Sequence, residues 1–375
     1  MTITRTQVLE TTGSLDIVSI DDDAMSVAGW VAAPDGTGID ELKILWGGER
    51  IEQMQLDLRL PSPDVAAVYP AIPGSDSCRF QLRAQAPRRK TDVLLSVLPK
   101  AAGRPGRRLY RFIDPSLPQP PQEHVTAVGG GEFILVALEM LDYFIDRAGL
   151  RPDDRVLDVG CGVGRIAYAL AYYLNEQGRY DGFDVMHSLI DWANKNIASR
   201  RPNFGFRHVN LHNQLYNPAG TLRADRFSFP YPDASFDFVA LTSVFTHIQR
   251  REVRHYLSEI ARVLEPGGRV AVTVFLLDRE GRDLIAQGRS TQPLVHPYKG
   301  GYVADRKHPE GAVGFDDAEM NGWIEESGLR ISGHYPGSWC GRTGGLSYQD
   351  LLVLERTASA DRREAPRGLA RLWRR

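Results

Sequence analysis

The sequence predicts an α/β protein with a doubly wound, mostly parallel sheet, preceded by a separate all-β domain of the sandwich type. Two observations predict this. In residues 155–165, RVLDVGCGVGR, an apolar run passes directly into alternating glycines, which is typical of a buried parallel strand that turns tightly into a helix. In residues 1–113, short apolar segments recur between turns with weak helical periodicity, which is typical of several short strands.

The turn after the first buried strand has the composition of a ligand-binding loop. Gly160, Gly162 and Gly164 alternate with apolar residues, and glycine at this spacing leaves no side chain between the backbone and a bound group. The spacing is not that of the dinucleotide pattern, which places its last glycine one residue later. Asp158, just before the loop, would repel a pyrophosphate but could pair with an ammonium group. The loop therefore favours a cofactor that carries an amino acid over NAD.

The next predicted strand supplies a second indication of a cofactor site. Residues 180–185 read YDGFDV, and Asp184 lies 20 residues after Gly164. An acid at the tip of the second strand is placed to accept hydrogen bonds from ribose hydroxyls. The alternative is that Asp184 caps the following helix, a position that aspartate also favours.

Four segments in this order resemble the successive motifs of the class I S-adenosylmethionine-dependent methyltransferases: RVLDVGCGVGR, GFDV, PDASFDFVALTSVFTHI and RVLEPGGRVAVTVF. The resemblance covers about residues 128–356 and implies a Rossmann-like sheet of seven strands, S-adenosylmethionine as the cofactor and methyl transfer as the activity. By position it assigns the methionine end to Asp158 and the glycine loop, the ribose to Asp184, and the adenine to Asn210, where many relatives carry aspartate. The implied cofactor-binding residues are Asp158, Gly160, Cys161, Gly162, Gly164, Asp184, Val185, Asn210, Leu211 and Thr242.

Composition narrows the class of protein. The 375 residues are enough for two domains, and a net charge of −2 gives no general case for a nucleic-acid-binding surface. The N-terminus lacks the apolar core of a signal peptide, and no apolar run reaches membrane-spanning length. The three cysteines, Cys78, Cys161 and Cys340, are too far apart for a metal site or a disulfide framework. We therefore expect a cytoplasmic protein without structural metal, without a nucleic-acid partner and without stable membrane insertion.

The first 113 residues are predicted as the β-sandwich domain. The expected strands are SLDIVSI, AMSVAGWVA, ELKILWG, ERIEQMQL, CRFQLRA and DVLLSVL, separated by turns such as PDGTG and PGSD. GWVAAPDG, RLPSPDVAAVYP and CRFQLRA are similar to β-sandwich modules of bacterial glycosyltransferases and other glycan-modifying enzymes. This similarity implies a glycan acceptor, and the alternative is a packing or dimerisation module without a ligand. Residues 21–23, three adjacent acids, are expected to form a solvated turn, because side chains alternate along a strand.

A proline-rich segment marks the domain boundary. Residues 114–125 contain DPSLPQPPQE, which favours a stiff, extended linker. The methyltransferase-like domain is predicted over residues 126–357 and begins with a helix that carries an apolar stripe from Phe133 to Ala148. The glycines of residues 129–131 either approach the methionine end of the cofactor or form a flexible entry. Residues 358–375 contain six arginines and are predicted as a basic, disordered tail, with contact to an anionic membrane surface as the alternative.

The remaining elements follow from alternating apolar patterns. We expect a helix from about Ser188, strands over 204–209, 235–241 and 269–277, a helix that ends before Pro266, and closing strands over 329–335 and 347–355. The connection 211–229 is long and therefore expected to be partly functional. The polar insertion 278–313 is expected to be a lid over the acceptor site, with a disordered loop as the alternative.

The chemistry is expected just past the fourth strand of this sheet. In open α/β sheets, ligands bind beyond the carboxyl ends of the strands, which here directs attention to residues 242–247. His247 is the one side chain in that segment that could take a proton near neutral pH, so it is the candidate catalytic base, with bracing of the next helix as the alternative. The sequence thus predicts a methyltransferase acting on a small or saccharide acceptor, with O-methylation favoured. A scaffold that retains the cofactor-binding fold is the alternative function.

Overall fold

The computed structural model describes residues 9–357, so the predicted basic tail at 358–375 lies outside the described residues. Contacts divide the chain into two compact units. Within the described residues, the first contains residues 9–154, 161–182 and 188–207, and the second contains residues 155–160, 183–187 and 208–357. None of the helices formed by residues 9–357 is both long and apolar enough to cross a membrane.

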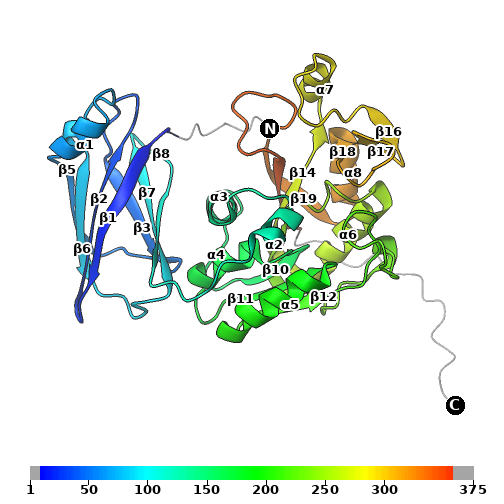
Figure 1. The fold of residues 1–375 in the computed structure, drawn as a ribbon, viewed down its shortest axis with the longest axis horizontal. Coiled ribbons are helices and arrows are strands. Elements are labelled where there is room, and N and C mark those ends of the chain that lie inside the picture. The colour runs from blue at the N-terminus through cyan, green and yellow to red at the C-terminus, as the bar shows by residue number, and fades with distance from the viewer. Residues whose placement is uncertain (1–8, 358–375) are drawn as a thin grey trace. The chain divides into compact units, whose positions relative to one another are not determined.

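The first unit begins with a β-sandwich (Figure 1). One sheet has the strand order β1-β2-β6-β5, and the other has the order β4-β3-β7-β8, with β9 paired to β7. Apolar residues of both sheets, such as Val27 and Ile44, form one fully buried core. The prediction of an N-terminal sandwich is confirmed. The strands are β1 Thr12–Ile20, β2 Ala24–Ala32, β3 Glu41–Trp46, β4 Glu49–Arg50, β5 Met54–Leu60, β6 Arg79–Gln85, β7 Val93–Ala101, β8 Arg104–Pro105 and β9 Leu109–Ile113, with α1 Pro63–Val68 between β5 and β6.

Helices α2 Gln122–Ala127, α3 Phe133–Asp146 and α4 Arg165–Tyr173 belong to the same unit as the sandwich. The proline-rich linker is held on α4, because the Leu117 amide donates to the Tyr172 hydroxyl at 2.9 Å and Tyr168 donates to the Leu117 carbonyl at 3.2 Å. Arg108, whose side chain is only 3% exposed, pairs with Asp142 and Asp146 of α3. A buried guanidinium requires such partners, so α3 and the strand region around Arg108 are held together.

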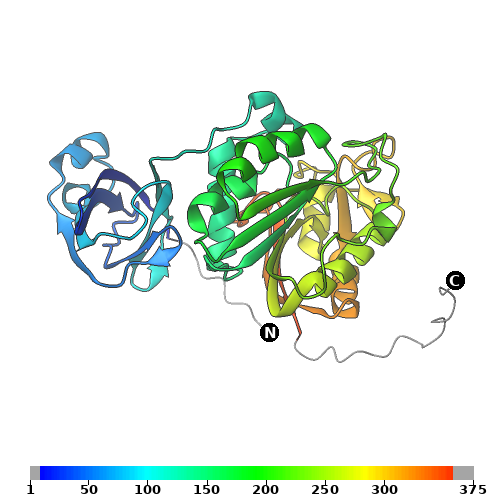
Figure 2. The same cartoon turned by 90° about the horizontal axis from the view of Figure 1, so that it is seen from below.

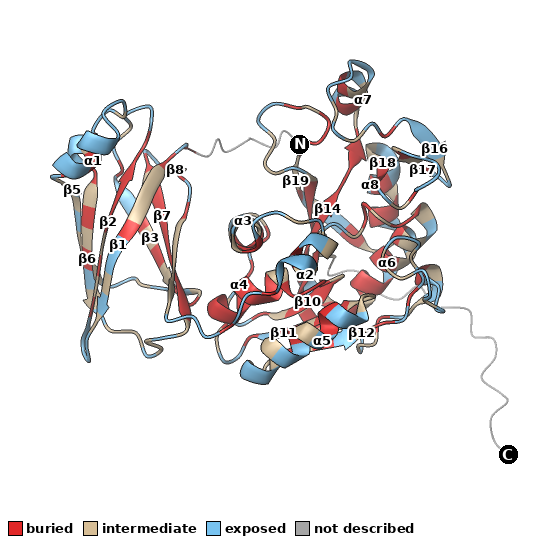
Figure 3. Ribbon diagram, in the orientation of Figure 1, coloured by how far each residue is buried: buried red, intermediate tan, exposed pale blue. Residues whose placement is uncertain are grey.

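A seven-stranded sheet has the order β12-β11-β10-β13-β14-β20-β19. β10 pairs with β13 and β13 with β14 in parallel, whereas β20 runs antiparallel to both β14 and β19. The prediction of a mostly parallel, doubly wound sheet is confirmed. Figure 3 shows the buried character of much of β14, whose buried second half, residues 270–274, is mostly apolar. The strands are β10 Arg155–Val159, β11 Arg179–Asp184, β12 Phe204–His208, β13 Phe236–Leu241, β14 Leu264–Val274, β19 Leu329–Tyr335 and β20 Asp350–Arg356, and α5 is His187–Asn196.

In the second unit, α6 Arg250–Val263 and α8 Asp317–Glu326 lie side by side (Figure 2). Both contribute to the apolar core that includes β13 and β14. The helix that was predicted to end before Pro266 is α6, which ends at Val263, whereas the strand expected over 269–277 is β14 and begins earlier, at Leu264. The physical reason is that Leu264 already pairs with Phe236 as the first residue of β14.

The insertion 278–313 is ordered, so the alternative of a disordered loop is wrong. It contributes α7 Arg279–Ala286, β16 His296–Tyr298, β17 Gly301–Val303 and β18 Val313–Asp316, and the latter three strands form a small sheet with β15 Leu276–Leu277. Arg342, 3% exposed, bonds to Asp278 and Glu280 at the start of this insertion. These two ion pairs anchor the insertion.

Candidate functional site

Two of the predicted site segments leave the same edge of the sheet. Asp158 on β10 is in register with Ala240 on β13, and the strands are parallel. The loop 160–164 and the segment 242–247 therefore both start at the carboxyl ends of neighbouring strands, where open α/β sheets bind ligands. Asp158 itself is fully buried. A carboxylate in that position requires hydrogen bonds or a charged partner.

Gly160 connects three of the predicted segments. Its amide donates to the Phe183 carbonyl at 2.9 Å, directly before Asp184. Its φ is +77°, and a Cβ added there would lie 2.5 Å from Cγ2 of Val244, in the segment that carries His247. Gly160 is thus required both by its conformation and by the close approach of Val244. The start of the glycine loop, the tip of β11 and the His247 segment come together here.

The rest of the loop turns the chain into α4. Gly164 is the N-cap residue of this helix, and Cys161 is buried. A Cβ on Gly162 would lie 3.0 Å from Val128, and Arg165 donates to the Gly130 carbonyl at 2.6 Å. Residues 128–130 therefore lie against the loop, as expected if they approach the cofactor. Backbone amides at a helix start following such a loop suit the polar end of an amino-acid-bearing cofactor.

Asp184 ends β11. Its Oδ1 accepts from the Met186 amide at 2.8 Å, and its carbonyl accepts from the Val209 amide at 3.0 Å. The carbonyl of Val185 accepts from Nε2 of His208 at 3.2 Å. The local bond to Met186 shapes the turn into α5, so the capping role and the ribose role of Asp184 are compatible.

Asn210 and Leu211 begin a compact loop over residues 210–222. The Asn210 side chain donates to Oγ1 of Thr221 at 3.1 Å and accepts from Asn217 at 3.3 Å. Leu211 is buried in the core, with 2% exposure. The structure thus involves the Asn210 amide in loop closure. Its predicted contact with adenine stays a prediction.

The segment after β13 is strained. Thr242 is half-buried, and the next residue, Ser243, has a φ of +59°. Its amide donates to Oγ1 of Thr273 at 2.7 Å. Residues other than glycine rarely adopt this conformation, and such strain concentrates at functional sites.

His247 is held from two sides. Its Nδ1 lies 2.8 Å from the Glu310 carbonyl, and its Nε2 lies 3.4 Å from the Tyr216 hydroxyl. The rings of His247 and Tyr216 meet edge to face, with 5.4 Å between centroids and 88° between planes. Burial lowers the pKa of His247, although the bond to the Glu310 carbonyl opposes this. The imidazole is therefore neutral near pH 7 and able to accept a proton.

Tyr216 and Glu310 were not predicted as site residues. The signal for Tyr216 was the unusual length of the connection 211–229, and Glu310 acts through a backbone carbonyl, which has no sequence signature. The structure brings both to His247. Among the residues described, no group of three or more histidine, cysteine or acidic side chains could hold a metal ion.

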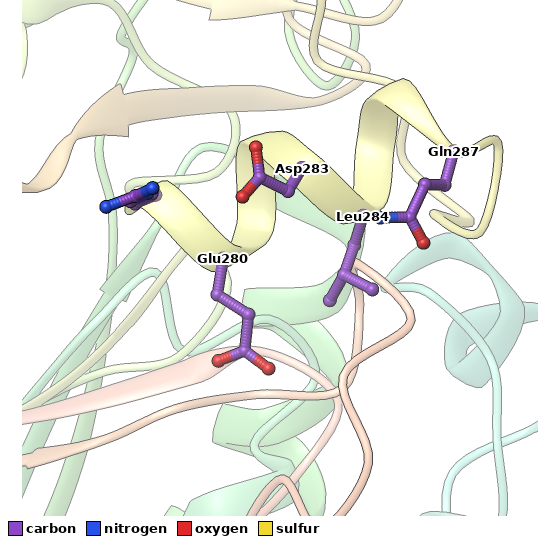
Figure 4. Close-up of a pocket in the computed structure, with 5 residues that line it drawn as sticks. Glu280, Asp283, Leu284 and Gln287 are labelled. Carbon is purple, nitrogen blue, oxygen red and sulfur yellow. The ribbon is translucent and has the colours of Figure 1, made fainter.

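One surface depression is unrelated to these segments. It is lined by five residues of a single helix region, α7 and the residue after it (Figure 4). Its residues are Arg279, Glu280, Asp283, Leu284 and Gln287. Because one helix supplies all of them, the depression lacks the converging polar groups of a binding site.

Comparison with known proteins identifies the region. Residues 157–272 match the family model described as "Methyltransferase domain". The chain is 35% identical over 128 residues to 27-O-demethylrifamycin SV methyltransferase from Amycolatopsis mediterranei, covering 34% of this chain and 41% of that one. It is 28% identical over 218 residues to the ubiquinone/menaquinone biosynthesis C-methyltransferase UbiE from Teredinibacter turnerae, covering 54% of this chain and 76% of that one. Among solved structures, the PH0226 protein from Pyrococcus horikoshii aligns with a TM-score of 0.42 and 17% identity, covering 61% of this chain and 93% of that one.

The matched part of the chain spans less than half the length of several curated relatives, 41% of the rifamycin enzyme and 44% and 47% of two demethylmenaquinone methyltransferases. The match to the family model confirms the predicted resemblance to the class I S-adenosylmethionine-dependent methyltransferases. It also supports S-adenosylmethionine as the cofactor of this domain.

Proposed function

We propose that this protein is an S-adenosylmethionine-dependent methyltransferase that methylates a hydroxyl group of a small or saccharide acceptor. The observation that carries the proposal is the meeting of the glycine loop, the tip of β11 and the His247 segment around Gly160. A cofactor loop close to a segment that carries a neutral, half-buried imidazole suits methyl transfer to a weakly acidic hydroxyl.

In this proposal Asp158 and residues 160–164 hold the methionine end of the cofactor, and Asp184 holds the ribose. The other residues that border the cofactor are Val185, Asn210, Leu211 and Thr242. When bound, S-adenosylmethionine supplies a methyl carbon on a positively charged sulfur, which is already a good leaving group. The protein then has to align the acceptor, exclude water and take the acceptor's proton. The last task falls to His247, because burial keeps its imidazole neutral.

The acceptor class rests on two considerations. A neutral imidazole is useful for a hydroxyl acceptor, because its oxygen must lose a proton as the new bond forms. The similarity of the sandwich to modules of glycan-modifying enzymes supports a saccharide. Two of the relatives are named for a demethylrifamycin and for ubiquinone/menaquinone biosynthesis, so an acceptor related to a quinone is the competing class.

The first test is a calorimetric titration of the full chain with S-adenosylhomocysteine, with NAD as the control. Micromolar binding of S-adenosylhomocysteine alone supports the proposal. The second step is transfer of a tritiated methyl group from S-adenosylmethionine to a panel of methyl glycosides and a naphthoquinol. Labelling of the glycosides supports a saccharide acceptor. Labelling of the quinol alone contradicts it and makes a quinol the proposed acceptor instead. Binding of neither cofactor refutes the proposal and favours a scaffold that retains the fold.

A further inference from the structure

Tyr216 and His247 form a hydroxyl–imidazole pair that extends the proposed chemistry. Tyr216 lies in the loop 210–222, with its hydroxyl oxygen 3.4 Å from Nε2 of His247. On the opposite side of the imidazole, Nδ1 lies 2.8 Å from the backbone carbonyl of Glu310. Both ring nitrogens therefore have a defined partner.

These partners determine which nitrogen carries the proton. A carbonyl oxygen can only accept a hydrogen bond, so Nδ1 of His247 is the protonated nitrogen of the neutral ring. Nε2 then has one lone pair in the plane of the ring, and the Tyr216 hydroxyl donates to it. A hydroxyl group of an acceptor cannot use the same lone pair while Tyr216 occupies it. While this bond is in place, an acceptor hydroxyl can pass its proton to Nε2 only through the Tyr216 oxygen.

We propose that Tyr216 is the catalytic residue that touches the acceptor hydroxyl, and that the acceptor's proton passes through the Tyr216 oxygen to Nε2 of His247. The inference rests on the proposed function. The acceptor O–H bond breaks as an O–H bond forms to Tyr216, whose own proton moves to Nε2. The acceptor oxygen keeps the electron pair with which it attacks the methyl carbon. The imidazolium formed on His247 then releases its proton to water.

The loop is built to hold this pair in place. Oδ1 of Asn213 accepts from the amides of Leu215 and Tyr216 at 3.0 and 2.8 Å. Nδ2 of Asn213 donates to the His247 carbonyl at 3.4 Å. The Gln214 amide donates to the Glu310 carboxylate at 2.5 Å. Three segments that are distant in sequence are thus tied to one another around the two rings, which is the preorganisation that a proton relay needs.

The electrostatic surroundings keep both members neutral. Burial, and after it the charge of Asp184, raise the pKa of Tyr216, while burial lowers the pKa of His247. Because Asp184 acts on Tyr216, the phenol lies within electrostatic range of the strand tip assigned to the ribose. Glu310, whose backbone carbonyl contacts His247, also acts on Glu252: burial first, and the charge of Glu310 after it, raise the pKa of Glu252. The charge of Lys299 lowers the pKa of Glu252.

The test is a long-range proton–nitrogen NMR correlation of the full chain labelled with ¹⁵N-histidine, followed over pH, with His247 assigned by the signal lost in His247→Asn. We expect the Nδ1-protonated form of His247 in the wild type. In Tyr216→Phe the Nε2 resonance moves, and the pKa of His247 rises by about 0.5–1 unit, because the lost bond stabilised the neutral ring. The matched control Tyr69→Phe, in the sandwich, leaves both unchanged. An Nε2-protonated ring, or a folded Tyr216→Phe with an unmoved Nε2 resonance, overturns the proposal.

A second arm measures transfer on the acceptor panel, extended by the acidic 4-nitrophenol. An alcohol needs the relay because its oxygen must lose a proton during methyl transfer, whereas an ionised phenol has already lost its proton. We expect Tyr216→Phe to lose about 100-fold in kcat on an alcohol, to keep its rate on 4-nitrophenol and to keep its affinity for S-adenosylhomocysteine. Equal losses on both acceptors assign Tyr216 a structural role and overturn the proposal. If S-adenosylhomocysteine does not bind the wild type, the proposed function fails, and the NMR arm still decides the state of the pair.

Discussion

Replacing Gly160 by alanine tests how the cofactor loop is seated. At φ +77° an alanine incurs the left-handed penalty of about 1–2 kcal/mol. Its methyl group would lie 2.5 Å from Cγ2 of Val244, a contact that real Cβ atoms do not make. Relieving it displaces the loop or Val244, and overpacking of this kind typically costs about 1–3 kcal/mol. We therefore expect Gly160→Ala to lower the free energy of unfolding by about 2–5 kcal/mol.

Urea denaturation followed by circular dichroism measures the loss, and Gly74→Ala is the matched control. Gly74 has nearly the same φ, +75°, but a Cβ added at this position would have no atom within 4 Å, so its variant reports the conformational penalty alone. The difference between the two variants isolates the contact with Val244. The affinity for S-adenosylhomocysteine, measured in parallel, should fall in Gly160→Ala and stay unchanged in Gly74→Ala.

A double-mutant cycle with Val244→Ala completes the test. If the methyl group of alanine at position 160 meets Val244, shortening Val244 recovers about 1–3 kcal/mol in the double variant. Strictly additive effects, or a Gly160→Ala loss no larger than that of Gly74→Ala, would show that the loop is not seated against the His247 segment. In that case the cofactor loop and the His247 segment would not form one site.

Three further outcomes are expected. Asp184→Ala should weaken S-adenosylhomocysteine binding about 10-fold or more in calorimetry, since a charge-assisted hydrogen bond contributes about 1.5–3 kcal/mol; unchanged affinity in a folded variant removes Asp184 from the site. His247→Asn should keep the affinity for S-adenosylhomocysteine and lower turnover. Because burial lowers the pKa of His247, the turnover of the wild type should stay constant down to below about pH 6.5. Burial raises the pKa of Asp142 to about 6 despite its pairing with Arg108. The folded state therefore holds this proton more tightly than the unfolded state, and the wild type should lose up to about 3 kcal/mol of stability relative to Asp142→Asn between pH 4 and pH 7, measured by urea denaturation at each pH.

The sheet could be predicted because its strands are defined by local composition. The segments 156–159 of β10, 238–241 of β13 and 270–274 of β14 are buried and mostly apolar, and the closing strand β19 has the predicted bounds. Ends that depend on long-range pairing are predicted less well: β14 begins at Leu264, where the strand was expected from residue 269, and α6 ends at Val263. Pro266 marks where a helix cannot continue, but the pairing of Leu264 with Phe236 ends it earlier.

The insertion 278–313 could not be read from its sequence, because its order comes from distant residues. Its polar composition is that of a mobile loop. In the structure, Arg342 lies buried against Asp278 and Glu280, more than 60 positions earlier in the chain, and Asp278 also accepts from the Gly281 amide at the start of α7. Charge patterns of this kind resemble a solvated surface until the fold brings the partners together.

The two halves of the candidate site differ in how far they can be predicted from the sequence. The cofactor half consists of motifs whose chemistry is local: a glycine that must adopt a positive φ and an acid at a strand tip. The acceptor half depends on Tyr216 and on the Glu310 carbonyl, which reach His247 from two connections with no motif of their own. Connections vary more readily than buried strands, because their backbone is less constrained by the core. Acceptor choice should therefore be encoded in residues 212–222 and 299–312, and exchanging either segment between enzymes of this fold should change the acceptor while leaving cofactor affinity intact.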